Sequence, residues 1–394
     1  MIKNRENNIF AGLDIGTSKV VAIVGRVQPD SSLEIIGMGQ HISKGLRKGV
    51  VANIESTVDS IQKAVEEAEL TADCRINSVF AGIAGAHISS LNSHGVVAIR
   101  DKEVDVADIE RVIEAARAQA IPNDQRVLHI LPQDFIIDGQ EGVREPIGMS
   151  GVRLETKVHI ITGALSAVQN IDKCIRRCGL EVDDLVLEQL ASSYAVLDAD
   201  EKELGVCLVD IGGGTSEVAV LSLGGIVYSR SVRVGGDKMD QAIVNYLRRE
   251  QKILIGEMSA ERIKKEIGTA QPPENGTGMA LTVRGRGTLD GVPKETEITE
   301  AMIAEALREP VTDIIDAVKI ALEAMPPELA ADIVDRGIVL TGGGALLRNL
   351  DTVIREQAQL PVMIADDPLK CVVNGCGHVL ENFTKMRTVL SPEV

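Results

Sequence analysis

The chain has 394 residues, a formal net charge of −17 and 2% aromatic residues, with no tryptophan. This length exceeds what one hydrophobic core normally supports, so two or more domains are expected, with cores of aliphatic side chains. The acidic balance argues against a nucleic-acid-binding protein, which needs clustered Lys and Arg. No apolar run is long enough for a membrane span, and the N-terminus carries no signal-peptide core, so the expected location is the cytoplasm.

The first predicted element is a strand that leads through a turn into a second strand. The apolar run Phe10–Leu13 enters the turn Asp14–Lys19, and further apolar residues follow the turn. A helix is expected next, over about Ile54–Ala68, because apolar residues recur there every three or four positions. In the turn, Gly16 lets backbone N–H groups approach an anion, and Asp14 could hold a hydrated Mg²⁺.

A later helical pattern carries two cysteines one turn apart and ends at Gly179. Cys174 and Cys178 could bind a metal, but no second Cys or His pair lies near them in the sequence. The chain has six cysteines, which do not form a disulfide framework at this length. We therefore interpret these two side chains as packed, reduced thiols.

The strand–turn–strand pattern around Asp14–Lys19 recurs about half a chain later. The apolar run Val206–Val209 enters the turn Asp210–Thr215, and a second strand over Ser216–Val220 follows the turn. One such hairpin by itself would more often be an ordinary turn, because an acidic residue before glycine commonly marks one. Two matching hairpins indicate two related domains that face each other across a cleft.

Three further segments complete the prediction. Pro272–Gly278 is expected to be a surface loop within a small subdomain, and Glu300–Met325 one or two helices with Pro310 as a start or kink. The glycines of Gly342–Gly344 follow an apolar strand, where backbone could pack against a base or ribose, or simply turn from strand to helix. The motifs of P-loop and dinucleotide-binding folds are absent from the sequence.

At these residues the sequence resembles the actin superfamily, and in particular two bacterial families within it. Residues 1 to about 204 resemble FtsA, a division protein family, at Gly12–Val20, Arg126–Gln133, Gly151–Arg153 and Leu190–Tyr194. Residues from about 205 to 394 resemble MreB, the cell-shape actins, at Val232–Asp237, Ala260–Lys264 and Thr341–Leu350. Because the two halves resemble different families, the sequence suggests a hybrid.

The resemblance implies an α/β fold of the actin/Hsp70-like ATPase type, with two related domains around a nucleotide cleft and an FtsA-type inserted subdomain called 1C. The implied boundaries are residues 1–83, 162–204 and 366–394 for domain I, 84–161 for 1C, 205–255 and 311–365 for domain II, and 256–310 for its small subdomain IIB.

The resemblance also implies ATP and Mg²⁺ as ligands and gives roles to site residues. Asp14 and Asp210 look like the Mg²⁺ ligands, acting through water. The phosphate cradle would be Gly16, Thr17, Ser18, Lys19, Gly212, Gly213, Gly214 and Thr215. The adenosine-binding positions would be Glu261, Lys264, Gly342, Gly343, Gly344 and Ala345. Glu188 matches the residue that orients the attacking water, with Ser216 beside it, and the alternative for Glu188 is a solvated helix residue.

Partners and membrane contact also follow from the resemblance. Self-association into filaments is implied, and the 1C-like insertion could recruit division proteins. The FtsZ contact of the FtsA family would fall in the MreB-like part, which leaves it in doubt, whereas a RodZ-like partner of MreB fits that part. Residues 383–390 could form a short amphipathic face, so membrane contact would be peripheral at most, at the inner face of the cell membrane.

The favoured function is a filament-forming, ATP-binding cytoskeletal protein that hydrolyses ATP slowly and acts in division or in cell-shape maintenance. A small-molecule kinase of the same superfamily is one alternative, but only Asp237 and Asp240 suggest a substrate base. A chaperone-type ATPase would need a further peptide-binding module. The remaining alternative is a folded, ATP-binding hybrid that forms no filaments.

Overall fold

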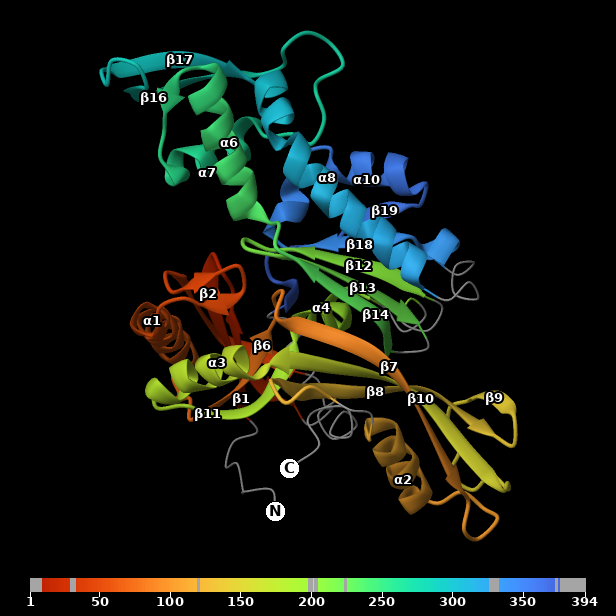
Figure 1. Cartoon of the computed structure of the whole chain (residues 1–394). Coiled ribbons are helices and arrows are strands. Elements are labelled where there is room, and N and C mark those ends of the chain that lie inside the picture. The colour runs from red at the N-terminus through yellow and green to blue at the C-terminus, as the bar shows by residue number, and fades with distance from the viewer. Residues whose placement is uncertain are drawn as a thin grey trace.

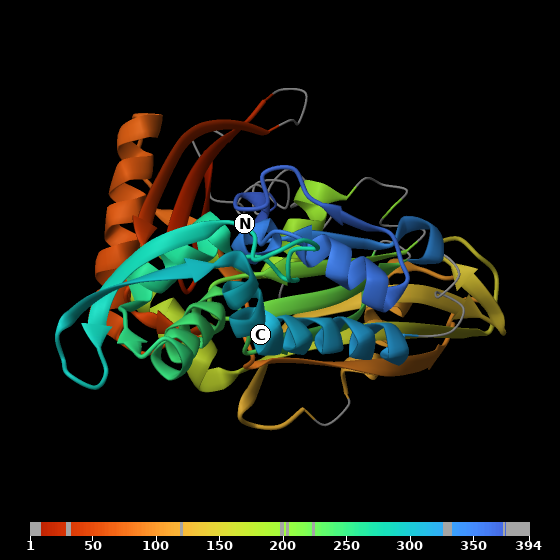
Figure 2. The ribbon, with the colours of Figure 1, turned by 90° about the horizontal axis from the view of Figure 1, so that it is seen from above.

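The computed structural model describes residues 9–28, 33–118, 121–197, 201, 205–222, 225–325, 333–372 and 375. Two five-stranded sheets form the centres of two neighbouring domains, and each domain carries a smaller appendage (Figure 1). Viewed from above, the gold strands of one appendage extend away from the first helix, which stands at the opposite side of the molecule (Figure 2).

The first central sheet has the strand order β11-β6-β1-β2-β3. Strands β1, β2 and β3 are antiparallel neighbours, whereas β6 and β11 run parallel to β1. The strands are β1 (Ile9–Ile15), β2 (Lys19–Val27), β3 (Leu33–Ile42), β6 (Ser78–Ile83) and β11 (Glu181–Leu187). Helices α1 (Ile54–Ala72) and α3 (Leu165–Arg177) pack on this sheet, and the short pair β4 (Leu46–Arg47) and β5 (Val50–Val51) precedes α1.

Helix α1 begins where the Asn53 side chain accepts a hydrogen bond from the backbone N–H of Ser56, at 3.0 Å. It ends four residues later than predicted, at Ala72, where Asp73 adopts the left-handed conformation with φ 50°. The predicted end at Ala68 marks only the last buried position, since the residues of the final turn are exposed or only partly buried.

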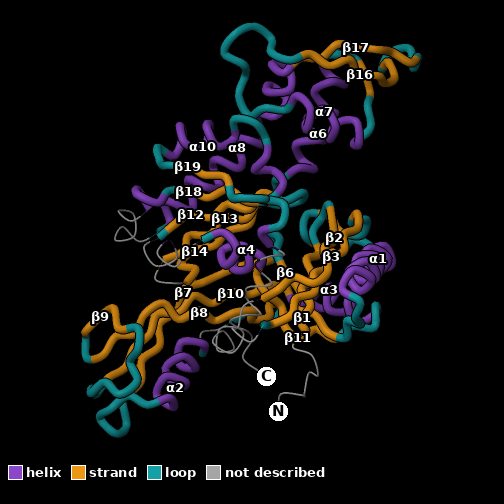
Figure 3. The backbone as a smooth tube through the Cα atoms, turned by 180° about the vertical axis from the view of Figure 1, so that it is seen from behind, coloured by secondary structure: helices purple, strands orange, loops and turns teal. Residues whose placement is uncertain are grey.

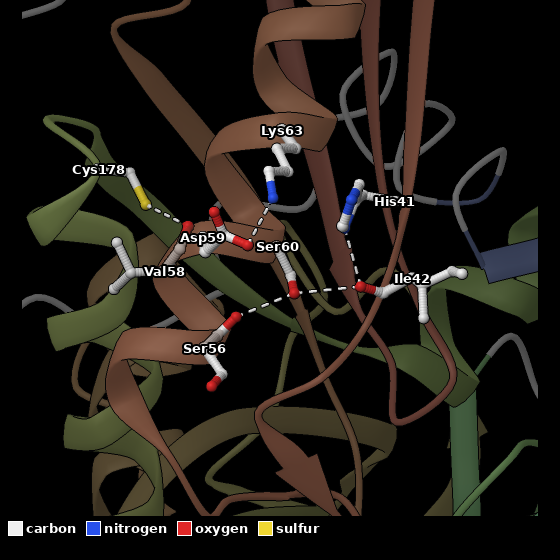
Figure 4. Close-up of polar contacts among 8 residues, drawn as sticks. All are labelled: His41, Ile42, Ser56, Val58, Asp59, Ser60, Lys63 and Cys178. Carbon is white, nitrogen blue, oxygen red and sulfur yellow. Dashed lines mark hydrogen bonds and ion pairs between the residues drawn. The ribbon is translucent and has the colours of Figure 1, made fainter.

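The packing of α1 on its neighbours depends on polar groups as well as apolar ones. Figure 4 shows Ser60 Oγ donating to the carbonyl oxygens of Ile42 and Ser56, at 3.1 and 2.9 Å. In the same view the Cys178 thiol lies 3.6 Å from the carbonyl oxygen of Val58. Cys174 is fully buried nearby, and both thiols are free, as the packed-thiol interpretation predicted.

An inserted sheet of order β7-β10-β8-β9 follows the first domain. Its elements are β7 (Ile88–Ala98), α2 (Val106–Arg117), β8 (Gln125–Ile137), β9 (Gln140–Val143) and β10 (Arg153–Ala164). Helix α2 covers one face, where Ala116 packs with Val158 and Ile160. The other face meets the second domain, because Leu131 and Ile161 share a core with Ile226.

The second central sheet repeats the first, strand for strand, in the order β14-β13-β12-β18-β19. Its first three strands are antiparallel neighbours, and the last two run parallel to β12. The strands are β12 (Val206–Ile211), β13 (Ser216–Ser222), β14 (Gly225–Val232), β18 (Ile338–Thr341) and β19 (Val362–Ile364). This repetition confirms that the duplicated hairpins belong to two related domains.

The second domain also carries a small appendage, at the top of Figure 1. It contains the three-stranded sheet β15-β16-β17, and Figure 3 shows α6 and α7 beside it. The elements in this part of the chain are α6 (Gly236–Glu250), β15 (Ile253–Leu254), α7 (Glu257–Ile267), β16 (Ala280–Gly287) and β17 (Pro293–Thr299). Helices α8 (Glu300–Ala324) and α10 (Leu350–Ala358) lie beside the central sheet of the second domain (Figure 1).

Two predictions of local structure are refined. Helix α8 is one helix that continues through Pro310, whose side chain is buried. After β18, the third glycine turn leads into a short 3₁₀ helix, η1 (Gly343–Leu346), and α10 begins only at Leu350. The predicted amphipathic segment 383–390 lies outside the described residues, and none of the described helices is long and apolar enough to cross a membrane.

Candidate functional site

The turns Asp14–Lys19 and Asp210–Thr215 meet between the two central sheets. A Cβ atom added at Gly213 would lie 1.9 Å from Ser18 Oγ, and one at Gly214 would lie 2.6 Å from Thr17 Oγ1. Glycine is therefore required at both places for the turns to approach each other this closely. The structure thus brings together the two turns that the sequence singled out.

Asp14 and Asp210 stand at the ends of β1 and β12 and share this buried space, with exposed fractions of 7% and 6%. Burial and the charge of Asp210 raise the pKa of Asp14 from 3.8 to about 7, and Lys19 opposes this rise. Burial also raises the pKa of Asp210, although its carboxylate accepts a hydrogen bond from Ser192 Oγ, which is 3.1 Å away.

Glu188 is the first residue of α4 (Glu188–Val196) and faces the same space. Burial and the charges of Asp14, Glu217 and Asp210 raise its pKa well above 4.5. A Cβ added at Gly82, on β6, would contact Glu188 Cγ at 3.4 Å. Glu188 therefore belongs to the cluster of carboxylates and does not lie on a solvated helix face.

Ser216 and its neighbour Glu217 point to opposite faces of strand β13. Ser216 is fully buried, and its hydroxyl donates to the carbonyl oxygen of Val234 at 2.7 Å. Strand side chains alternate, so Ser216 points away from the face that Glu217 shares with Asp210, its partner in the β12–β13 register. Ser216 therefore does not face the space shared by Asp14 and Asp210, whereas Glu217, which sequence analysis missed, does.

Glu217 is 3% exposed and accepts a hydrogen bond from Ser231 Oγ at 2.9 Å. Burial and the charge of Asp210 raise its pKa from 4.5 to about 8. The signal in the sequence that could have identified Glu217 is its place as the only ionisable residue in an otherwise uncharged strand, β13. Every position of this strand is buried, where a lone carboxyl group is costly.

We expect Glu217→Gln to change the pH dependence of stability. The folded state holds the Glu217 proton more tightly than the unfolded chain, so wild-type stability falls as the pH rises from about 4.5 to about 8. Glutamine keeps the acceptor for Ser231 but cannot ionise. The variant should match the wild type at low pH and exceed its free energy of unfolding by a few kcal/mol above pH 8, as measured by urea titration. Parallel pH profiles for the two proteins would contradict this expectation.

Lys19 links the first turn to a segment from the C-terminal part of the described chain. Its Nζ donates to the carbonyl oxygen of Leu369 at 2.5 Å. One residue earlier, the carbonyl oxygen of Pro368 accepts from the backbone N–H of Gly342 at 2.9 Å. This segment therefore connects the Lys19 side chain of the first domain with the glycine turn Gly342–Gly344 of the second domain.

The third glycine turn packs directly behind Asp210. Gly342 has φ 77°, and a Cβ there would lie 2.5 Å from Asp210 Oδ1. A Cβ at Gly344 would lie 2.2 Å from Ile211 Cγ2. All three predicted glycine turns thus converge on one site, where the backbone of Gly342–Ala345 forms part of its wall.

The two predicted residues of α7 differ in their connection to this site. Lys264 Nζ lies 2.9 Å from both an Asp240 carboxylate oxygen and the carbonyl oxygen of Gly236. The N–H of Gly236 in turn donates to the carbonyl oxygen of Gly212 in the second turn, at 3.0 Å. Glu261 pairs with Lys265 at 2.6 Å, and its side chain is 47% exposed. Lys264 is thus connected through Gly236 to the second turn, Asp210–Thr215, and Glu261 lies at the outer edge of α7.

Sequence analysis also missed Lys48. It occupies the turn between β4 and β5 with φ 51°, and a Cβ on Gly214 would lie 2.9 Å from its Cα. The next residue, Gly49, donates its N–H to Thr17 Oγ1 at 3.2 Å. An exposed lysine is therefore held against both hairpin turns, and the Lys-Gly pair in a short turn was the signal available in the sequence.

The residues fit a cation and a phosphate group. Asp14 Oδ1 is buried and has no hydrogen-bond partner, and the carboxylates around it repel one another, so a divalent ion would stabilise them. The described residues contain no set of three or more His, Cys, Asp or Glu side chains placed to hold a metal by themselves. A Mg²⁺ ion that keeps its waters and arrives with a phosphate suits such a site.

Comparison with known proteins gives two matching family models. The model of the MreB/Mbl protein family matches residues 160–388, and that of the SHS2 domain inserted in FtsA matches residues 85–162. The chain is 50% identical over 364 residues to the cell division protein FtsA of Pseudomonas aeruginosa, covering 92% of this chain and 84% of that protein. It is 39% identical to FtsA of Escherichia coli, covering 89% of this chain and 82% of that protein.

Solved structures give the same fold. MreB5 of Spiroplasma citri bound to AMPPNP superposes with a TM-score of 0.65 at 24% identity, covering 96% of this chain and 98% of that chain. The PilM–PilN complex of type IV pilus biogenesis gives a TM-score of 0.65 at 16% identity, covering 94% of this chain and 98% of that chain.

Proposed function

Because the chain belongs to the FtsA family of cell division proteins, we propose that it binds ATP with Mg²⁺ between its two actin-like domains and acts in bacterial division. The observation that carries the ligand proposal is the meeting of the two glycine turns, with Asp14 and Asp210 buried behind them. Its test is ATP binding by the intact chain with and without Mg²⁺, for which the variants are given in the Discussion.

Both halves of the chain belong to this family. FtsA of Pseudomonas aeruginosa is 50% identical over 92% of the chain, which includes both sides of residue 204. Residues 160–388 also match the model of the MreB/Mbl family, in agreement with the MreB resemblance of the second half. The resemblance to both families is therefore supported. Division is accordingly the favoured process, in place of cell-shape maintenance.

In the proposed complex the backbone of both turns would hold the phosphates, with hydroxyls from Thr17, Ser18 and Thr215. Asp14 and Asp210 would hold Mg²⁺ through water, and Lys19 would exchange its Leu369 partner for a phosphate oxygen. Lys48, at the tips of the turns, would add a second positive charge. The adenosine would lie between Lys264 and the Gly342–Ala345 wall, with Glu261 at the outer edge.

We propose slow ATP hydrolysis, in which Glu188 orients the attacking water. The bound Mg²⁺–nucleotide would supply the reactive phosphate and neutralise its charge. Glu188 is suited to accept a proton, because burial and the neighbouring carboxylates raise its pKa well above 4.5. Glu217 stands beside it as a second group able to hold a proton.

We expect Glu188→Gln to slow ATP hydrolysis by about 100-fold while leaving ATP affinity nearly unchanged, because glutamine keeps the shape and loses the base. Phosphate release under single-turnover conditions and equilibrium nucleotide titration measure the two quantities. Glu181→Gln, an exposed change on β11, is the matched control and should behave as the wild type. If Glu188→Gln hydrolyses ATP at the wild-type rate, Glu188 has no part in the reaction.

We further propose that the chain assembles with copies of itself, and that the inserted sheet recruits other division proteins. Contacts between unlike faces of successive copies produce open filaments. FtsZ is a candidate partner, since an FtsA relative covers both halves of the chain. A RodZ-like partner stays a second proposal, since residues 160–388 match the MreB/Mbl family model. Peripheral attachment to the inner face of the membrane remains a proposal. Sedimentation in ATP and Mg²⁺, compared with sedimentation in ADP, tests self-assembly. If the protein binds ATP but does not sediment, the proposal that it forms filaments is refuted.

A small-molecule kinase has less support. Of the two carboxylates that could serve as its base, Asp240 is paired with Lys264 at 2.9 Å. Burial and Asp240 raise the pKa of the other, Asp237. No described group besides these two points to a substrate hydroxyl in the cleft.

A further inference from the structure

Helix α4 lies between the two central sheets, and its first residue is Glu188 (Figures 1 and 3). The helix follows β11 directly, because β11 ends at Leu187, the residue just before it. Leu187 occupies the N-cap position with φ −60° and ψ 128°, and its side chain makes no capping hydrogen bond. Whatever holds the backbone of Leu187 therefore also sets the direction in which the Glu188 side chain leaves the helix.

The backbone N–H of Leu187 needs a partner from outside its own sheet. Strand β11 is the edge strand of the first central sheet, so N–H groups on its outer side meet no further strand of that sheet. Leu187 is only 1% exposed, and a buried N–H without an acceptor is costly. His129 supplies the acceptor, since its Nε2 lies 3.0 Å from the backbone nitrogen of Leu187.

His129 comes from β8 of the inserted sheet and is fully buried. A ring nitrogen that accepts a hydrogen bond carries no proton, so the ring is neutral with its proton on Nδ1. Two residues further along the same face of β8, Leu131 packs with Leu187 in a shared apolar core. The inserted sheet therefore holds the start of α4 both by a directed hydrogen bond and by packing beside it.

The next turn of α4 is held by the second domain. Ser192 lies one helical turn after Glu188, on the same face, and its Oγ donates to Asp210 Oδ2 at 3.1 Å. On the side of the first domain, a Cβ added at Gly82 would contact Glu188 Cγ at 3.4 Å. With the later turn held at Asp210, the orientation of the Glu188 carboxylate depends on the contact that holds Leu187.

We propose that His129 is a positioning residue for ATP hydrolysis, which acts through Leu187 to aim Glu188 at the attacking water. The inference rests on the proposed role of Glu188 and extends the hydrolysis site to a residue of the inserted sheet. A histidine that only stabilised the core would affect unfolding and leave the hydrolysis rate of the folded protein unchanged. The two roles therefore predict different results.

Two amide substitutions at His129 test the proposal, because they differ only in reach. In His129→Gln the amide oxygen can take the place of Nε2, whereas in His129→Asn it is one methylene group too short. We expect single-turnover hydrolysis at saturating ATP to fall about tenfold or more in His129→Asn, because small misplacements of reacting groups are costly, and to stay close to the wild-type rate in His129→Gln. ATP affinity, measured by equilibrium titration, should change in neither variant. His94→Asn, at an exposed histidine on β7 of the same sheet, is the matched control and should behave as the wild type.

Glu188→Gln in the same assay separates this inference from the function on which it rests. If Glu188→Gln is slow but the two His129 variants hydrolyse ATP equally fast, His129 does not position Glu188. If Glu188→Gln is as fast as the wild type, the proposed role of Glu188 fails as well.

A measurement on the wild type decides the matter even if His129→Asn does not fold. Long-range nitrogen NMR of the full chain should show the ring proton of His129 on Nδ1, as the hydrogen bond from Leu187 requires. A proton on Nε2 would overturn the proposal, since that nitrogen could then not accept from Leu187.

Discussion

Asp210→Asn will abolish the Mg²⁺ dependence of ATP binding. The wild type should bind ATP much more tightly with Mg²⁺ than without it, because Asp14 and Asp210 would hold the ion together with the phosphates. Asparagine keeps the size of the side chain and its acceptor for Ser192 Oγ, which lies 3.1 Å away. The charge alone is lost, and we expect ATP affinity in Mg²⁺ to fall by about 100-fold.

The same variant should not be less stable than the wild type in the absence of metal. Burial raises the pKa of Asp210, which means that its charge destabilises the folded state. Urea unfolding without Mg²⁺ therefore separates a loss of ligand binding from a loss of folding. Asp101→Asn, an exposed change in the inserted domain, is the matched control and should leave both quantities unchanged. If Asp210→Asn kept its response to Mg²⁺, the metal would be bound elsewhere.

Gly214→Ala will separate the two domains at the site. The added methyl group would lie 2.6 Å from Thr17 Oγ1, 2.9 Å from Lys48 Cα and 3.1 Å from Lys48 N, all in the first domain. A backbone neighbour cannot rotate away as a side chain can, so the first domain must move. We expect ATP affinity to fall by about tenfold or more, since overpacking of this kind costs about 1–3 kcal/mol.

Gly212→Ala is the matched control for this change. Its methyl group would meet only Thr215 O, at 3.3 Å and within the same turn, and neither glycine adopts a left-handed backbone. Nucleotide titration and small-angle scattering of both variants give affinity and domain separation. An equal domain separation of the two alanine variants in scattering would show that the turns do not approach each other across the cleft.

A third glycine change distinguishes side-chain from backbone contact. At Gly213 the nearest atom is Ser18 Oγ, 1.9 Å from the added Cβ. Because that atom belongs to a side chain, Ser18→Ala should restore part of the affinity lost in Gly213→Ala. No comparable rescue by Thr17→Ala is expected for Gly214→Ala, because the Lys48 backbone remains in the way.

The duplicated core could be predicted from the sequence because its signals are local. Two apolar runs that enter Asp-x-Gly turns define β1–β2 and β12–β13, and their repetition indicates the repeated sheet. The boundary of α1 was less accurate, since no residue of its last turn is buried and only the left-handed Asp73 ends it.

The site was predicted less completely, because several of its contacts join distant parts of the chain. Lys48 meets Gly214, and Lys19 meets Leu369, through contacts that no sequence spacing reveals. Ser216 and Glu217 are adjacent in the chain, and the register of β13 against β12 decides which of them faces Asp210. The assignment to families could be made from local motifs, and the second half matches the MreB/Mbl family model as well as the FtsA relatives.

Anomalous diffraction from crystals grown with ATP and Mn²⁺ in place of Mg²⁺ is the most direct test of the central claim. We predict one manganese peak between the carboxylates of Asp14 and Asp210, with the phosphates in contact with both glycine turns. A manganese peak remote from these two side chains, or a nucleotide held by one domain alone, would contradict it.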